Sequence, residues 1–131
     1  MVRQPPISAL NRTRGTLVAD NVRVARTHWS RLRGLIGTGH ADFPAGQALW
    51  VLPCRGVHTC GIRFPLDLIY LDKSNYVIDL RQELPPWSFG PFHFHAASVM
   101  ELPAGTIRKS RTEIGDKVEI VTAGEPEKQA A

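Results

Sequence analysis

Residues 51–72 read V-L-P-C-R-G-V-H-T-C-G-I-R-F-P-L-D-L-I-Y-L-D, and they hold both cysteines of the chain, Cys54 and Cys60. Apolar segments with the composition of β-strands flank them, at 48–52 and at 66–71. The second segment is apolar in almost every position, which is typical of a strand buried on both faces of a sheet. We therefore expect these two strands to form the core and the reactive residues between them to form the functional site.

Further strands are predicted on both sides of this stretch. Asp20-Asn21 separates the first two of them and indicates a hairpin turn. Trp29, Leu32, Leu35 and Ile36 recur at helical spacing and predict a short helix over 27–36, and a second short helix or turn is expected between Gly105 and Gly115. The predicted strands cover residues 16–19, 22–25, 76–84, 98–102 and 117–121.

Most links between these strands are too short for a crossover helix, so the sheet should be largely antiparallel. The fold class is mainly β, bordering on α+β. We predict a small, largely antiparallel, partly closed β-barrel or sandwich with one or two short helices.

A chain of 131 residues is expected to fold as a single globular domain, here over residues 14–122. Residues 1–13, with Pro5-Pro6, are predicted to be a flexible basic tail, and residues 123–131 a polar tail. The sequence contains neither the ~20-residue apolar run of a membrane span nor the apolar core of a signal peptide. We expect a cytoplasmic monomer without a cofactor and without a membrane partner.

The positive charge lies in the first third of the chain. Residues 1–40 hold seven arginines and one carboxylate, whereas residues 41–131 hold nine basic and eleven acidic residues. Such an N-terminal region is able to bind polyanions non-specifically. The sequence has no recognised RNA- or DNA-binding motif, so nucleic acid is not the favoured partner.

Several spaced motifs resemble one uncharacterised family. They are the early R-L-R-G-L at 31–35, the P-C, V-H-T and R-F-P-L-D elements at 53–67, L-P-P-W at 84–87, V-M-E-L-P-A-G at 99–105 and G-D at 115–116. Together they resemble the family called domain of unknown function 192 over roughly residues 15–121. Ile62 stands where the family motif has methionine. The resemblance implies a common ancestry and no particular reaction.

Cys54, His58 and Cys60 suggest two kinds of chemistry. Thiolates and imidazole are zinc ligands, and Asp67, His93 or His95 would supply a fourth, although the spacing differs from the C-x2-C of zinc folds. Alternatively, His58 activates Cys54 or Cys60 as a nucleophile while Asp67 orients the imidazole. Buried thiols beside a hydrogen-bonded histidine are the structural alternative, and we assign no metal site.

A binding site is the third possibility. Arg63 is suited to a carboxylate or phosphate, with Thr59 and Arg33 as neighbours, unless it forms a buried ion pair with Asp67 that only shapes the R-F-P-L-D turn. In the F-H-F-H segment at 92–95, a strand would place both aromatic rings on one face and His93 and His95 on the other. The candidate ligand-binding residues are Arg33, Cys54, His58, Thr59, Arg63, Asp67, His93 and His95.

The sequence lacks a nucleophile elbow, a phosphate-binding loop, a strong metal motif and paired catalytic carboxylates. It therefore favours a binding or accessory module over an enzyme. Its cleft should be lined by residues 54–67 and its ligand should be small or anionic. A Cys/His-based enzyme or metal protein and a polyanion binder using the N-terminal arginines remain as alternatives.

Overall fold

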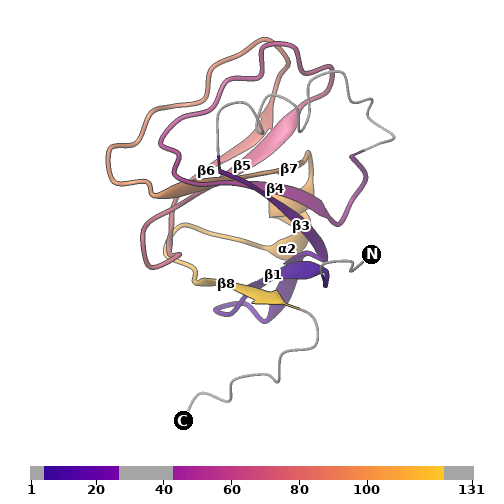
Figure 1. Ribbon diagram of the computed structural model, residues 1–131, viewed down its shortest axis with the longest axis vertical. Helices are drawn as coiled ribbons and strands as arrows, with labels where there is room; N and C mark the ends of the chain where they lie inside the picture. The colour runs from indigo at the N-terminus through magenta and orange to yellow at the C-terminus, as the bar shows by residue number, and fades with distance from the viewer. Residues whose placement is uncertain (1–4, 27–42, 123–131) are drawn as a thin grey trace.

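The computed structural model describes residues 5–26 and 43–122 and arranges them in two β-sheets with one short helix (Figure 1). The smaller sheet has the order β2-β1-β8 and the larger has the order β3-β4-β7-β5-β6. The elements are β1 Ile7–Asn11, β2 Thr16–Ala19, β3 Asn21–Ala25, β4 Gln47–Val51, β5 Leu66–Leu71, β6 Val77–Leu84, β7 Ser98–Pro103, α2 Thr106–Ser110 and β8 Val118–Thr122. No helix among the described residues is long and apolar enough to cross a membrane.

Strands β5 and β7 lie inside the larger sheet, and every residue of both is buried. Their continuous apolar composition follows from this position, because both faces of each strand pack against other parts of the protein. Neighbouring strands of this sheet are antiparallel, except that β3 runs parallel to β4. The predicted mainly β, largely antiparallel class is confirmed, and the described strands form no closed barrel.

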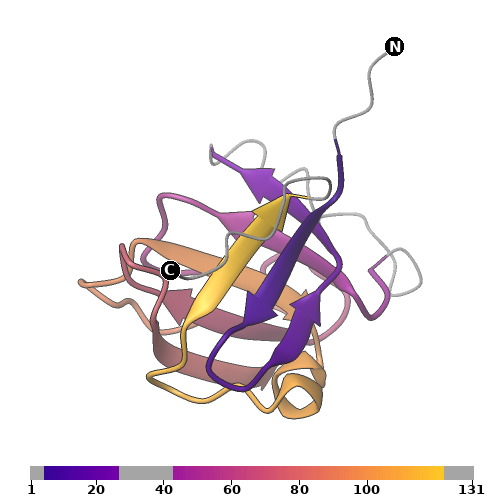
Figure 2. The same cartoon turned by 90° about the horizontal axis from the view of Figure 1, so that it is seen from below.

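The two faces of the larger sheet are covered differently. One face packs on the smaller sheet and α2, and the strands of the two sheets cross in Figure 2. The other face packs on irregular chain, including Phe43, Val57, Ile62, Phe64 and Ala96. The molecule is thus a sandwich on one side and a sheet covered by loops on the other.

The first strand corrects the predicted tail at residues 1–13. Ile7–Asn11 is the central strand of the smaller sheet and pairs with both β2 and β8. Asn11 is fully buried, and its amide donates to Thr112 and to Asp116. The segment I-S-A-L-N is short and does not alternate strictly between apolar and polar residues, so periodicity does not reveal it, and one of its partners, β8, lies at the other end of the sequence.

The predicted hairpin at Asp20-Asn21 is also wrong. The strands on either side of it, β2 and β3, belong to different sheets. The backbone N–H groups of Asp20 and Asn21 both donate to the carbonyl of Gly46, which fixes the turn against the start of β4. The predicted helix at 27–36, and with it Arg33, lies outside the described residues.

Candidate functional site

Two irregular segments lie side by side over the loop-covered face of the larger sheet. We call residues 53–60 and 87–97 the loop ribbon. Backbone hydrogen bonds join the segments in antiparallel order along their length, from Cys54 with Ala97, through Arg55 with His93 and Val57 with Gly90, to Thr59 with Ser88. Figure 1 shows the two segments running together at the top of the molecule, away from the smaller sheet.

Thr59 fixes one end of the loop ribbon. Its side chain is fully buried, its hydroxyl donates to the carbonyl of Pro85, and it accepts a hydrogen bond from the backbone N–H of Ser88. At the other end, the N–H of Ala97 donates to the carbonyl of Leu71, the last residue of β5. One end of the ribbon is therefore fixed by the Thr59 hydrogen bonds to Pro85 and Ser88, and the other end is fixed to strand β5.

Gly90 brings the middle of the loop ribbon close to the sheet. A Cβ atom at this position would lie 2.7 Å from the Tyr70 hydroxyl and 3.0 Å from Leu68 Cδ1. The same Tyr70 hydroxyl donates to the carbonyl of Pro91 at 2.8 Å. Any side chain larger than hydrogen would push the ribbon outward, so glycine is required by this close approach.

His93 ties the ribbon to the edge strand β6. Its Nε2 lies 2.5 Å from Asp79 Oδ2, and its ring packs edge-on against Tyr70 with the ring centroids 4.8 Å apart. Burial alone would raise the pKa of Asp79. The hydrogen bonds from the Leu80 N–H and from His93, together with the charge of Arg81, outweigh it and hold that pKa below its ordinary value. Asp79 is therefore a charged anchor for the ribbon.

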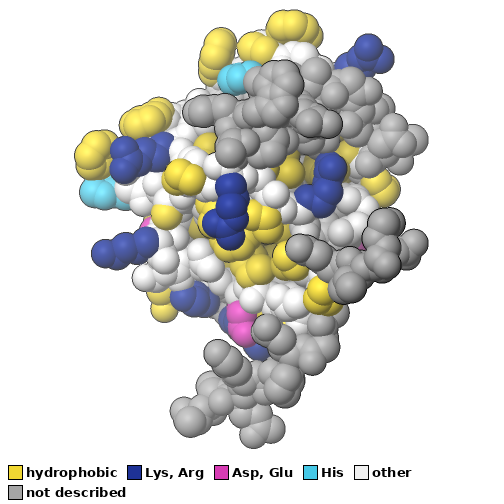
Figure 3. Space-filling model, in the orientation of Figure 1, with side chains coloured by type: hydrophobic (Ala, Val, Ile, Leu, Met, Phe, Trp, Pro, Cys, Tyr) yellow, Lys and Arg dark blue, Asp and Glu magenta, His cyan; other side chains and the backbone are white. Residues whose placement is uncertain are grey.

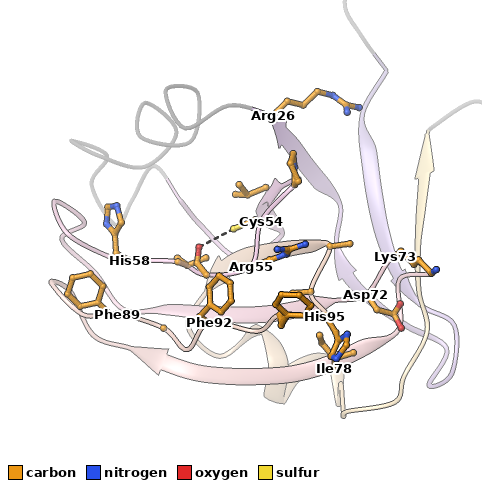
Figure 4. A pocket seen from close by; sticks show the side chains of 18 of the residues that line it. Arg26, Cys54, Arg55, His58, Asp72, Lys73, Ile78, Phe89, Phe92 and His95 are labelled. Carbon is orange, nitrogen blue, oxygen red and sulfur yellow. Dashed lines mark hydrogen bonds between the residues drawn. The ribbon is translucent and has the colours of Figure 1, made fainter.

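A cavity of about 1410 Å³ opens along the loop ribbon. Figure 4 shows labelled side chains of the lining on the ribbon, on the β5–β6 turn, at Arg26 just after β3 and at Ile78 in β6. The volume exceeds the ~300–1,000 Å³ of ordinary small-molecule sites. Its lining consists of Arg26, Val51, Pro53, Cys54, Arg55, Gly56, Val57, His58, Asp72, Lys73, Ser74, Ile78, Phe89, Gly90, Phe92, Phe94, His95, Ala96 and Ala97.

Three phenylalanines of the lining are exposed to solvent. Phe89, Phe92 and Phe94 have exposed fractions of 77%, 68% and 69%. Trp87, at the start of the same segment, is 73% exposed. Figure 3 shows hydrophobic side chains projecting along the upper and left edges of the molecule, beside basic and histidine side chains. Clustered exposed aromatic residues mark binding surfaces in soluble proteins.

The charged groups of the lining are mostly cationic. Arg26, Arg55 and Lys73 form no ion pair with any of the described residues, and the guanidinium of Arg55 lies over the Phe94 ring at 5.1 Å. Asp72 is the one carboxylate among the lining residues, and its Oδ1 accepts backbone hydrogen bonds from Ser74 and Tyr76 within the β5–β6 turn. Positive charge therefore predominates in the cavity.

Three of the predicted site residues line the cavity, namely Cys54, His58 and His95. Both cysteines are free, and the Cys54 thiol donates to the carbonyl of Gly56 at 3.1 Å. Cys60 is not part of the lining, and its backbone N–H lies 3.3 Å from His58 Nδ1. Thr59 and His93 instead support the loop ribbon from beneath.

Asp67 lies on the opposite face of the sheet from the cavity. It alternates with Leu66 and Leu68, which pack on the loop-covered side, and it faces α2. Its carboxylate is fully buried and accepts backbone hydrogen bonds from Glu83, Gly105 and Ile107. The structure thus does not bring Asp67 together with His58.

Arg63 is exposed, and no ion pair joins it to Asp67 in the described structure. Among the described residues, no group of three or more Cys, His, Asp or Glu side chains converges to hold a metal ion. Two of the N-terminal arginines have acidic partners: Arg12 pairs with Glu119, and Arg14 pairs with Glu113 and Asp116. Part of the basic N-terminal charge is therefore neutralised within the fold.

The F-H-F-H segment differs from the predicted strand. Pro91 and a turn at residues 94–95 prevent regular pairing, so the phenylalanines face solvent and His93 points inward to Asp79. The sequence analysis missed Arg26, Arg55, Asp72, Lys73 and Phe89 as lining residues. One signal was available, since four aromatic residues fall within eight positions of a Pro- and Gly-containing loop.

The sequence matches the model of domain of unknown function 192, described as "Uncharacterized ACR", over residues 9–120. A UPF0127 protein of Thermococcus sibiricus is 30% identical in an alignment of 115 residues that covers 84% of this chain and 72% of that protein. A UPF0127 protein of Pyrococcus furiosus is 31% identical in an alignment of 115 residues that covers 84% of this chain and 95% of that protein.

Two crystal structures have a similar fold. A protein of unknown function from Novosphingobium aromaticivorans superposes with a TM-score of 0.72 at 19% identity, covering 87% of this chain and 83% of that one. A putative transcription regulator from Sinorhizobium meliloti superposes with a TM-score of 0.68 at 16% identity, covering 89% and 93%. At these identities the likeness shows the fold alone.

Proposed function

The chain belongs to the family of domain of unknown function 192, whose description names no reaction, and we propose that it is a binding module for a small molecule with an apolar body. The observation that carries the proposal is the cavity of about 1410 Å³ beside three exposed phenylalanines of the loop ribbon. Exposed phenyl rings leave apolar surface in water, and a ligand that covers them gains about 25 cal/mol for each Å² removed from water.

The loop ribbon supports a binding role because its backbone is fixed by contacts on one side, while its phenyl side chains are exposed on the other. His93 and Gly90 hold the ribbon against the sheet through a hydrogen bond to Asp79 and a close contact with Tyr70, and Thr59 joins its two segments. Such a support keeps the lining side chains in place before a ligand arrives, which lowers the entropy lost on binding.

A catalytic role has less support. Asp67 faces the other side of the sheet, and the Cys54 thiol donates a hydrogen bond to a backbone carbonyl. Asp67 is therefore not placed to orient the His58 imidazole, as a Cys–His–Asp arrangement requires.

The test is a titration with the neutral apolar fluorophore N-phenyl-naphthylamine, followed by amide chemical shifts in NMR spectra. We expect saturable binding with shifts confined to residues 53–58, 72–74 and 88–97. Phe92→Ala should weaken binding about fivefold or more, since a phenyl contact contributes on the order of 1 kcal/mol or more.

Ile114→Ala is the matched control, because Ile114 is 62% exposed and lies outside the cavity. It should leave the affinity unchanged. An absence of saturable binding, or shifts spread over the whole surface, would refute the proposed function.

A further inference from the structure

The lining of the cavity changes along the loop ribbon, from an apolar end, past Arg55 in the middle, to an end that carries the charged side chains of Asp72 and Lys73. At the apolar end, His58 and Phe89 form a β-bridge, and Val57 and Gly90 are joined by a backbone hydrogen bond. The opposite end of the ribbon, where Cys54 bonds Ala97, adjoins the β5–β6 turn that carries Asp72 and Lys73.

Figure 4 shows this division directly. His58 and Phe89 lie at one end of the cavity, Asp72 and Lys73 lie at the other, and Phe92 and Arg55 lie between them. The lining residues of the apolar end carry one imidazole and no other ionisable side chain. The cationic groups Arg26, Arg55 and Lys73 are thus away from Phe89.

Resting on the proposed function, we infer that the ligand is an amphiphilic anion, with its apolar body against Phe89 and Phe92 and its carboxylate, sulfonate or phosphate group towards Arg55 and Lys73. A neutral apolar compound would form no ion pair with these cations. An anion without an apolar body would leave the phenyl rings in water. Only a molecule with both parts satisfies both ends of the cavity.

Arg55 is the cation best placed to hold the anionic group. Its backbone carbonyl accepts from His93 in the middle of the ribbon, and its guanidinium lies over Phe94. The ring contact limits the rotamers of the exposed arginine before the ligand binds. A guanidinium also offers two parallel N–H donors to a carboxylate or phosphate, and a lysine does not.

The experiment compares two fluorophores with the same fused and phenyl rings. Anilinonaphthalene sulfonate carries an anionic group, and N-phenyl-naphthylamine does not. We expect the sulfonate to bind about tenfold or more tightly, because hydrogen bonds to charged groups are worth roughly 1.5–3 kcal/mol. This advantage should shrink as salt is added.

Two substitutions separate the ends of the cavity. Arg55→Gln should remove most of the sulfonate's advantage and leave the neutral fluorophore unchanged, and Lys73→Gln should act in the same direction. Phe89→Ala should weaken both fluorophores. Arg108→Gln, an exposed arginine of α2 that does not line the cavity, should change neither.

The outcomes distinguish the inference from the function on which it rests. Equal binding of the two fluorophores, unchanged by Arg55→Gln, would overturn the amphiphilic anion and leave the binding module standing. Binding of neither fluorophore would overturn both. Urea unfolding of each variant verifies that it is folded under the titration conditions.

Discussion

The two faces of the five-stranded sheet differ in how many of their charged side chains have partners within the protein. On the face covered by the smaller sheet, the Asp67 carboxylate accepts three backbone hydrogen bonds and Asn11 bonds Thr112 and Asp116. On the loop-covered face, the cavity holds exposed phenyl rings and the cations Arg26, Arg55 and Lys73. Polar groups with partners inside the protein stabilise the fold, whereas charged groups that line a cavity beside exposed apolar side chains are available to a ligand.

The largest expected loss of stability comes from the face covered by the smaller sheet, at Asp67. Asp67→Ala removes the acceptor of the Glu83, Gly105 and Ile107 N–H groups, so it should lower the free energy of unfolding by about 3 kcal/mol or more. Asp67→Asn keeps one acceptor oxygen and should lose less. Urea unfolding measures both variants.

Arg63→Ala is the control for Asp67, because sequence alone suggested that the two residues form a pair. Arg63 is exposed and is not bonded to Asp67, so its loss should change stability by no more than about 0.5 kcal/mol. A large loss of stability in Arg63→Ala would support an Arg63–Asp67 ion pair. It would contradict the bonding of Asp67 to backbone N–H groups alone.

The second prediction concerns the support of the cavity. Gly90→Ala places a Cβ 2.7 Å from the Tyr70 hydroxyl, so it should cost about 1–3 kcal/mol and weaken fluorophore binding. Gly56→Ala on the facing segment meets nothing nearer than 3.6 Å, and its stability should stay within about 0.5 kcal/mol. Equal stabilities for the two variants would show that the close contact of Gly90 with Tyr70 does not constrain the ribbon.

Sequence reasoning succeeded where local pattern and tertiary position agree. Leu66–Leu71 was recognised as a core strand because it is apolar on both faces, and the structure buries all six residues. The same reasoning failed for Ile7–Asn11, a short segment that pairs with the nearby β2 and with β8, which is more than a hundred residues away. Non-local pairing of this kind leaves no mark in a short segment.

The sequence motifs single out only some of the residues that line the cavity. Cys54, His58 and His95 are among the lining residues, and Thr59, Arg63, Asp67 and His93 are not. Asp67 lies in the same stretch, but the alternation of β5 turns it to the other face of the sheet. Lys73 and Phe89 reach the cavity only because the loop ribbon and the β5–β6 turn meet in space.

The third prediction concerns the pH dependence of stability that arises from the Arg14–Asp116 ion pair. Burial would raise the pKa of Asp116, but hydrogen bonds from Arg14, Asn11 and the Glu113 N–H outweigh it and lower that pKa. The contribution of this carboxylate to stability is therefore complete above the ordinary aspartate pKa of about 4. It is lost as the pH falls through the lower pKa of the folded state.

Urea midpoints at neutral pH and near pH 3 measure this loss. Wild-type protein should become less stable on acidification, and Asp116→Asn should show a smaller change because its amide does not titrate. An equal pH dependence in both proteins would mean that Asp116 does not contribute through its charge. Asp79 adds to the wild-type slope in the same direction, because its pKa is also lowered.

The smallest expected change in stability is that of a substitution on the loop-covered face, at Phe92. It tests directly whether the exposed phenyl rings of that face are separate from the core. Phe92→Ala deletes a large apolar side chain, yet Phe92 is 68% exposed, so unfolding free energy should change by no more than about 0.5 kcal/mol. Val57→Ala on the facing segment deletes far fewer atoms, but Val57 is 4% exposed and its loss leaves a cavity. At about 0.8 kcal/mol for each buried methyl-sized group, plus the cavity, it should cost on the order of 2 kcal/mol.

Phe92→Ala, the larger truncation, should therefore have the smaller effect on stability and a clear effect on fluorophore affinity. If Phe92→Ala destabilised the protein as much as Val57→Ala, the phenyl ring would be part of the core. That result would contradict the proposal that the loop-covered face is a binding surface.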